Sequence, residues 1–265
     1  MKDKSPELKV AIEAALSAGK ILEKYFEKDI LKELKEDTSI VTIADKESEQ
    51  VIKKIISTNF PTHSILGEET GLTQNGGDFT WHIDPVDGTR NFSNGIPIFC
   101  VSIALEKNGG LFLGVIYNPI TRSLFFAEKG KGAYLNENKI SVSKDDIHHS
   151  IVTVSPGTGD GAKELLLELY YNLPKVVRSV RNLACTAMEL AYIARGGLEA
   201  NIQLGLNTYD FAAGVLLVQE AGGMVTDLDG GKWNFPENRF IVSNGLFHNR
   251  LVEELRRQKE KLGII

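Results

Sequence analysis

Helix-type and strand-type patterns alternate through much of this chain, and this alternation limits the folds that are open to it. Apolar residues recur in short continuous runs, as in buried strands, and between these runs at helical spacing. The second half is expected to contain strands at 151–154, 176–180, 198–204 and 224–227, and helices at 161–171, 186–194, 210–221 and from near His248. This mixture predicts a layered α/β or α+β architecture.

The first half is expected to begin with two helices. Ser5-Pro6 is typical of an N-cap followed by proline at the first helical position, and apolar residues from Leu8 onward recur at helical spacing. A second helix is expected over 44–58, followed by a short strand over 64–67. The polar, glycine-rich stretch 70–78 is expected to be a loop.

From residue 99 to residue 140 the pattern becomes strand-like. Two apolar runs flank Asn108-Gly109-Gly110, which is a typical hairpin signal. Residues 141–150 form the best boundary within the chain. We therefore expect one unit made of two packed halves, at about 1–145 and 146–265.

Composition excludes several classes of protein. With 265 residues, of which 42% are hydrophobic and 25% charged, the chain can bury a large core. A net charge of −5 without a basic block argues against a polyanion as the main partner. No apolar stretch approaches the ~20 residues of a membrane span, and the N-terminus lacks the apolar region of a secretory signal. Cys100 and Cys185 are expected to be buried, reduced thiols, and the protein to be cytoplasmic, with no membrane and no nucleic-acid partner.

Two acids end a predicted buried strand in the sequence WHIDPVDGTRNF, residues 81–92. Asp84 and Asp87 offer hard oxygen ligands, and Gly88 allows the backbone to approach a ligand closely. If a helical turn begins at Thr89, the amides of Gly88 and Thr89 form an anion site. Such a pairing suits Mg²⁺-assisted phosphoryl transfer. The alternative is that both aspartates merely cap a turn.

Further acids lie at the ends of other expected elements. Glu68 and Glu69 follow a short strand, and Asp210 begins a helix that is apolar on nearly every face. Taken alone, Asp210 is better explained as an N-cap than as a ligand, because acids are favoured at helix N-termini.

In combination, these segments resemble one known family. GEE (67–69), DPVDGTRNF (84–92) and YDFAAGVLLVQEAGG (209–223) occur in the order and at the distances seen in the inositol monophosphatase family. The segments SIVTIADKESE (39–49), GKGAYLN (130–136) and LACTAMELAYIARGG (183–197) match it too. These are Mg²⁺-dependent, lithium-sensitive phosphatases whose superfamily includes fructose-1,6-bisphosphatases. The resemblance implies a layered αβαβα sandwich with the active site between the halves.

The resemblance also implies a set of metal ligands. Glu68, Asp84 and the carbonyl of Val86 would bind one Mg²⁺, and Asp84, Asp87 and Asp210 a second. A third, more weakly held ion would lie near Glu68. Two to three Mg²⁺ ions per site are therefore expected.

Catalytic and substrate-binding roles follow from the same resemblance. Glu68, Thr89 and Asp45 are the expected catalytic residues: Thr89 contacts the attacking water, and Asp45 polarises Thr89 and reaches the third ion through water. Metal-activated water would attack phosphorus in line without a covalent intermediate. No histidine is needed, and His82 is expected to be structural. The expected substrate-binding and phosphate-binding residues are Asp87, Gly88, Thr89, Arg90, Ala184, Cys185, Thr186, Gln203 and Asp210.

The residues that would recognise the alcohol depart from the animal inositol-specific pattern. Ala184-Cys185-Thr186 stands where those enzymes have Gly-Thr-Ala, Gln203 stands in place of a glutamate, and Tyr209 in place of a tryptophan. Ser39 replaces the usual acid of its loop. Arg90 suits a second anionic group on the substrate, but a surface or intersubunit ion pair is the favoured interpretation. The resemblance therefore implies the chemistry without fixing the substrate.

Several functions fit these observations. The leading interpretation is a phosphomonoesterase acting on myo-inositol monophosphate or a similar sugar or polyol phosphate, in a homodimer. The alternatives are fructose-1,6-bisphosphatase activity, alone or as a dual activity, and less favoured histidinol-phosphatase or 3′-nucleotide phosphatase activity. A non-catalytic regulatory protein that binds RNA or a polymerase is the candidate from another class.

Overall fold

The computed structural model describes residues 4–28, 32–34, 40–157 and 161–263. Ser39, where the sequence departs from the family pattern, lies outside these residues. The helices are α1 (Pro6–Tyr25), α2 (Ile43–Asn59), α3 (Thr89–Phe92), α4 (Ala162–Asn172), the 3₁₀ turn η1 (Leu173–Lys175), α5 (Thr186–Ala194), α6 (Thr208–Glu220) and α7 (His248–Leu262).

The strands form a large sheet, a smaller sheet and a short ribbon. The ribbon is β1 (Lys32–Leu34) with β2 (Ile40–Thr42). The large sheet contains β3 (Ser64–Gly67), β4 (Gly71–Thr73), β5 (Phe79–Asp87), β6 (Cys100–Lys107), β7 (Gly110–Asn118), β8 (Ser123–Glu128), β9 (Ala133–Leu135) and β10 (Asn138–Lys139). The smaller sheet contains β11 (Ile151–Ser155), β12 (Ser179–Arg181), β13 (Ala200–Leu204), β14 (Met224–Thr226) and β15 (Arg239–Ser243).

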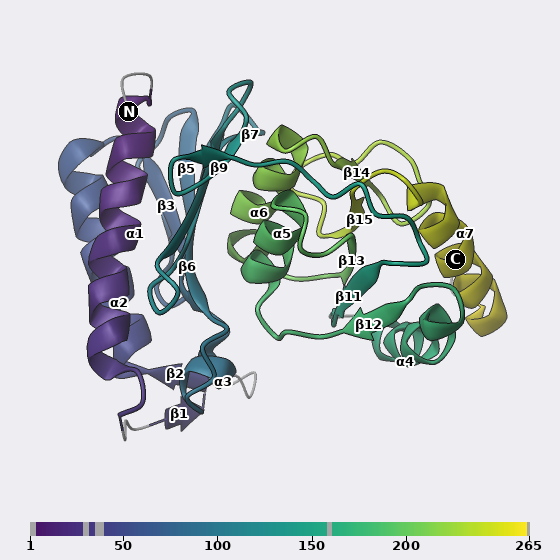
Figure 1. The fold of residues 1–265 in the computed structure, drawn as a ribbon. Helices are drawn as coiled ribbons and strands as arrows, with labels where there is room; N and C mark the ends of the chain where they lie inside the picture. Colours follow the sequence, from purple (N-terminus) through teal and green to yellow (C-terminus); the bar gives the residue numbers. More distant parts are fainter. Residues whose placement is uncertain (1–3, 29–31, 35–39, 158–160, 264–265) are drawn as a thin grey trace.

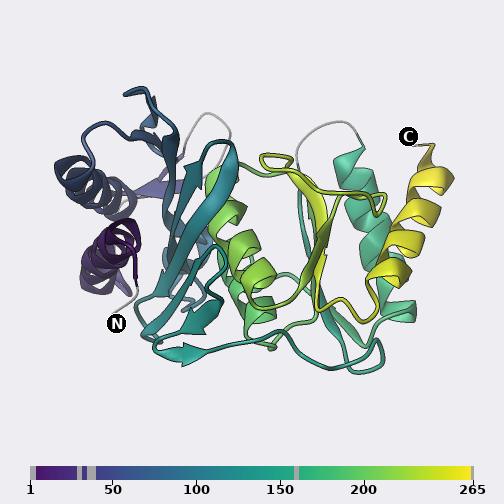
Figure 2. The same ribbon diagram turned by 90° about the horizontal axis from the view of Figure 1, so that it is seen from above.

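These elements stack in five layers. Figure 1 shows α1 and α2 outside the large sheet, α5 and α6 between the two sheets, and α4 and α7 outside the smaller sheet; Figure 2 shows the same order from above. The strand order is β10-β9-β8-β7-β6-β5-β3-β4 in the large sheet and β12-β11-β13-β15-β14 in the smaller one. The expected αβαβα sandwich is confirmed, and the expected boundary at 141–150 lies between the sheets.

Most of the expected elements are present, but the ribbon of β1 and β2 was not expected, and three further differences concern the two sheets. The expected strand at 176–180 is wrong in position: η1 ends at Lys175 and the strand begins only at Ser179. The stretch 70–78, expected to be a loop, contains β4, which pairs with β3. Strand β15 was not expected at all, although it pairs with both β13 and β14 and so holds that sheet together.

Local signals explain where the first helices begin. The Ser5 side chain accepts a hydrogen bond from the Leu8 amide at 3.1 Å, as predicted for the N-cap of α1. Helix α2 begins with a capping box, in which Thr42 accepts from the helix and Asp45 accepts from the Thr42 amide at 2.8 Å. This cap orients the Asp45 carboxylate at the helix start.

The central layer is apolar on both sides because it is buried by two sheets. Phe211, Leu217 and Met188 of α5 and α6 are all fully buried. At Gly114 of β7 a Cβ atom would lie 2.7 Å from the carbonyl oxygen of Ala213 in α6. Helix α6 therefore rests on the large sheet at a distance that only glycine permits. Among the described residues, no helix is both long and apolar enough to cross a membrane.

We expect Gly114→Ala to destabilise the protein by about 1–3 kcal/mol, because the added methyl group would push α6 away from β7. Gly110→Ala on the same strand is the matched control, since its nearest neighbour would be 3.8 Å away. Urea unfolding of both variants measures the difference. Equal free energies of unfolding would show that α6 is not held at this contact.

Candidate active site

A break in strand pairing brings two acids to one side of the large sheet. Asp84 and Asp87 are three residues apart, so regular alternation would point them to opposite faces. Asp84 pairs with Ser102 and Asp87 with Cys100, so β5 has one residue more than β6 across this interval. The extra residue reverses the alternation, as in a β-bulge. Both carboxylates therefore share a face, which the sequence motif alone did not show.

Gly88 turns the chain directly after these acids. It has φ 89°, and a Cβ atom there would lie 2.9 Å from the carbonyl oxygen of Ile98. No other residue fits this left-handed, crowded position without strain. The turn begins α3 at Thr89, and Arg90 is exposed on the same short helix.

Glu68 lies beside these acids because β3 runs parallel to β5. The Glu68 amide donates to the carbonyl of Ile83 at 3.1 Å, so both strands end at one edge of the sheet. Glu49 of α2, fully buried, accepts from the Glu69 amide at 2.8 Å and from the Thr70 hydroxyl at 2.5 Å. Sequence reasoning gave Glu49 no role, although it follows Asp45 by one helical turn and so faces the same way.

The first turn of α6 supplies the fourth acid. The N-cap of α6 is Asn207, not Asp210. Asp210 is the third residue of the helix, and in a capping box its carboxylate accepts a hydrogen bond from the Asn207 amide at 2.8 Å. His82 holds this turn in place, because its ring lies 2.7 Å from the Thr208 hydroxyl and 3.0 Å from Glu106. His82 is therefore structural, as predicted.

The acids repel one another where they meet. Asp84 is 2% exposed, and burial, together with the charges of Glu68, Asp87 and Asp210, raises its pKa well above the usual value. Asp84 also shares a hydrogen bond with Glu68. Burial raises the pKa of Asp87 to about 7, although the Ala187 amide opposes this shift. The cluster therefore gathers acidic groups whose mutual repulsion disfavours the fully ionised state.

Asp45 and Thr89 meet at the side of this cluster. Burial raises the pKa of Asp45 to about 6, against hydrogen bonds from Thr42. The Thr89 hydroxyl lies 3.1 Å from Asp45 Oδ1 and 2.9 Å from the carbonyl oxygen of Val86. A hydroxyl has one proton, so Thr89 donates to one of these acceptors at a time.

The second half reaches the site through residues 183–187. The Ala187 amide donates to Asp87 Oδ2 at 2.6 Å, and the Cys185 thiol lies 3.3 Å from the same oxygen. Ala184 has φ 54°, a left-handed conformation that costs a non-glycine residue about 1–2 kcal/mol. The resemblance places glycine at this position in animal enzymes. Alanine is therefore strained here.

Glu189 fixes this segment from behind. It is 1% exposed and accepts from the Leu183 amide at 2.7 Å, from Ser155 at 3.1 Å and from Asn201 at 3.0 Å. Burial raises the pKa of Glu189. Sequence reasoning missed this residue, because nothing in a helix-type pattern distinguishes a buried acid from an exposed one.

The expected substrate residues lie at different depths. Thr186 and Gln203 are buried, Gln203 completely, and Arg90 is exposed. Alternation along β13 puts Gln203 on the face of Asn201, which carries the Glu189 network. Within the described part of the chain, neither atom of the Gln203 amide has a hydrogen-bond partner.

The donor set fits a magnesium site. Carboxylates and a backbone carbonyl are the oxygen ligands that Mg²⁺ prefers. The raised pKa values of Asp84, Asp87 and Asp45 show that adding positive charge would relieve a real electrostatic cost. Val86, Glu68 and the aspartates could therefore hold such ions.

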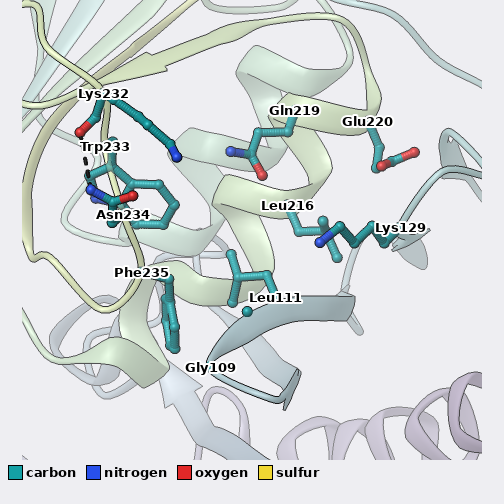
Figure 3. Close-up of a pocket in the computed structure, with 11 residues that line it drawn as sticks. Gly109, Leu111, Lys129, Leu216, Gln219, Glu220, Lys232, Trp233, Asn234 and Phe235 are labelled. Carbon is teal, nitrogen blue, oxygen red and sulfur yellow. Dashed lines mark hydrogen bonds between the residues drawn. The ribbon is translucent and has the colours of Figure 1, made fainter.

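A separate hollow lies at the other end of α6. It has a volume of about 530 Å³ and is lined by Leu216, Gln219, Lys129, Lys232 and Trp233, among others (Figure 3). None of the four acids lines it, so it is distinct from the acidic cluster.

Comparisons with known proteins identify the family and the fold. A model of the inositol monophosphatase family matches residues 3–260. A Pasteurella multocida protein named Nus factor SuhB is 37% identical over 86% of this chain and 87% of its own length. A Thermotoga maritima fructose-1,6-bisphosphatase/inositol-1-monophosphatase is 36% identical over 84% and 85%. The structure of an IMPase from Thermotoga maritima superposes with a TM-score of 0.89 at 32% identity, over 98% of this chain and 100% of that one.

In metal-free buffer we expect stability to fall as pH rises from about 4 towards 7. Folded Asp45 and Asp87, with pKa values of about 6 and about 7, bind protons more tightly than the unfolded chain, where the value is 3.8. Mg²⁺ should therefore raise the melting temperature more at neutral than at acid pH.

Asp84→Asn tests the origin of this effect by removing one of the repelling charges. We expect it to raise the melting temperature in EDTA at neutral pH and to lose most of the stabilisation by Mg²⁺. Asp146→Asn, on the surface, should change neither. A variant that melts below wild type in EDTA, or that keeps the full Mg²⁺ response, would contradict this interpretation of the cluster.

Proposed function

Because this chain belongs to the inositol monophosphatase family, we propose that it is a Mg²⁺-dependent phosphomonoesterase for myo-inositol monophosphate or a similar sugar or polyol phosphate. The observation that carries the proposal is the meeting of Glu68, Asp87 and Asp210 around the buried Asp84, where burial and then these three charges raise the pKa of Asp84. Such a set needs cations to be ionised together. The relatives' names support the substrate class.

The proposed ligands are those acids and the Val86 carbonyl. When bound, Mg²⁺ lowers the pKa of water and neutralises charge on the phosphoryl oxygens. With the Val86 carbonyl used as a ligand, the Thr89 proton is left to Asp45, which lies 3.1 Å away. The lone pairs of the Thr89 hydroxyl can then accept a hydrogen bond from the attacking water. Asp45 thus orients Thr89, and ionised Asp45 does so best.

The turn at Gly88 supplies the proposed phosphate contacts. Its left-handed backbone begins α3, so the amides of Gly88 and Thr89 lie at the start of a helical turn. Free amides at such a position favour an anion. Close packing of neighbouring backbone and side-chain atoms around Gly88 keeps this turn in one conformation.

The alcohol part of the substrate is proposed to meet residues from the second half. The Ala187 amide fixes Asp87, and residues 184–186 border this contact. The side-chain amide of Gln203, which has no hydrogen-bond partner among the described residues, lies on the same face of β13 as Asn201, a partner of Glu189. An amide without a charge should discriminate less between hydroxyl patterns than a carboxylate. We therefore propose a broad substrate range.

A dual activity towards fructose 1,6-bisphosphate is the second candidate, because a relative carries both names. Regulation of transcription is a third, since another relative is named Nus factor SuhB. Because of that name, the absence of a nucleic-acid partner stays a prediction. The homodimer and the cytoplasmic location stay predictions as well. A pull-down of RNA polymerase with wild type and Asp84→Asn would separate binding from catalysis.

The first functional test is phosphate release from a panel of sugar and polyol phosphates. We expect turnover with Mg²⁺, none in EDTA, and inhibition by millimolar lithium. Asp84→Asn and Asp210→Asn should fold but lose activity, because each removes a proposed ligand charge, while Asp146→Asn keeps it. Full turnover in metal-free buffer would refute the proposal.

Arg90→Ala tests whether Arg90 binds a second anionic group on the substrate. If the exposed Arg90 side chain contacts that group, we expect KM for fructose 1,6-bisphosphate to rise about tenfold, which corresponds to ~1.4 kcal/mol, with little change for a monophosphate. Arg195→Ala, whose guanidinium packs on Tyr192, is the control arginine. Equal effects of Arg90→Ala on both substrates would place Arg90 outside the pocket.

Gln203→Met tests the recognition of the alcohol with a side chain of similar size and no polar amide. We expect the melting temperature to hold or rise, because two unsatisfied buried atoms are removed. KM for myo-inositol 1-phosphate should increase several-fold, as expected for the loss of a hydrogen bond worth about 1 kcal/mol. Unchanged KM values across the substrate panel would exclude Gln203 from recognition.

A further inference from the structure

Two thiols and a carboxylate lie together beside the acidic cluster. Ligand atoms of Asp87, Cys100 and Cys185 all fall within 4.8 Å of one another. The two sulfurs are 3.8 Å apart, and Cys185 Sγ lies 3.3 Å from both Asp87 Oδ2 and the Asp87 carbonyl oxygen. Both cysteines are free and buried, as predicted.

We infer that Asp87, Cys100 and Cys185 form a site for a thiophilic divalent cation of the Zn²⁺ and Cd²⁺ class. Two sulfurs that each lie ~2.3 Å from a tetrahedral zinc ion are about 3.8 Å apart, and the observed separation is 3.8 Å. A sulfur and a carboxylate oxygen on such an ion are roughly 3.5 Å apart, close to the 3.3 Å found here. The Asp87 carbonyl offers a further oxygen.

The site is built from both halves of the molecule. Cys100 begins β6 of the large sheet, and Cys185 is the N-cap residue of α5. The Ala187 amide donates a hydrogen bond to Asp87 Oδ2 at 2.6 Å. At the start of the same segment, the Leu183 amide donates to the buried Glu189 carboxylate. The ligands are therefore positioned before any ion arrives, which reduces the cost of binding.

The chemistry separates this site from the proposed magnesium site. Sulfur is a soft ligand that selects zinc-like ions, whereas Mg²⁺ requires oxygen. Each metal–sulfur bond replaces an S–H bond, and the proton leaves to solvent, so one ion releases two protons. Asp87 belongs to both sets. Given the proposed function, an ion on the thiols would draw Asp87 from magnesium, and the site would be inhibitory.

Cadmium binding tests the site directly, because a cadmium–thiolate pair absorbs in the ultraviolet. Cd²⁺ is added to the whole protein in excess Mg²⁺, with a phosphine reductant that keeps the thiols reduced. The chain has two cysteines, so a thiolate band reports on this pair alone. We expect the band to saturate at one ion per chain and to be reversed by Zn²⁺.

Variants then locate the ion. Cys100→Ser, and Cys100→Ala as a second replacement should the first not fold, are expected to weaken binding at least tenfold, by analogy with losses at other metal sites. His149→Ala is the matched control, because His149 and Asp146 form a surface pair 3.0 Å apart whose side chains are also of the type that binds zinc. The band should be unchanged in that variant.

Three results would overturn the inference: no thiolate band in folded wild type, a band of full affinity in either Cys100 variant, or a band lost in His149→Ala. The binding measurement needs no turnover, so it stands apart from the proposed function. If the protein is a phosphatase, Cd²⁺ should inhibit wild type at least tenfold more strongly than the folded Cys100 variant. Binding without any phosphatase activity would fault the proposed function and leave the metal site intact.

Discussion

Repulsion between carboxylates gathered around the buried Asp84 is the constraint on which the site depends. Glu68, Asp84, Asp87 and Asp210 come from three different elements, and burial, followed by the charges of the other three acids, raises the pKa of Asp84. Such an arrangement opposes folding unless the elements that carry it are held firmly. The bulge in β5, the crowded turn at Gly88 and the capping box of α6 supply that rigidity. A divalent cation bound among these acids would offset their repulsion.

Two further buried acids position the site without belonging to the proposed ligand set. Glu49 ties α2 to the turn that carries Glu68, and Glu189 ties α5 to the segment that reaches Asp87. Each accepts several hydrogen bonds, which is how a buried carboxylate is tolerated. Glu49 acts from the first half and Glu189 from the second. Each of these acids fixes its own half, and the hydrogen bond from the Ala187 amide to Asp87 joins the two halves at the site.

The thiol pair shows how close the second half comes. Cys185 occupies a position where the sequence departs from the animal inositol-specific pattern, and its sulfur lies 3.8 Å from Cys100 and 3.3 Å from Asp87. The strained Ala184 precedes it directly. These departures therefore fall at the contact between the halves, where they change what surrounds Asp87 while leaving the carboxylates in place.

The sequence by itself determined a layered α/β architecture, the start of α1 at Pro6 and the extent of α5, because periodicity and capping residues are local properties. The αβαβα order and the joint role of the four acids were what the resemblance to the family implied. It did not determine β15, whose pairing with β13 and β14 depends on residues distant in the chain. It did not show that Asp84 and Asp87 share a face, because the register with β6 decides this. The roles of Glu49 and Glu189, and the meeting of Cys100 with Cys185, 85 residues apart, were likewise decided by the tertiary structure alone. Burial and long-range contact create these features, and neither is written in any short stretch of sequence.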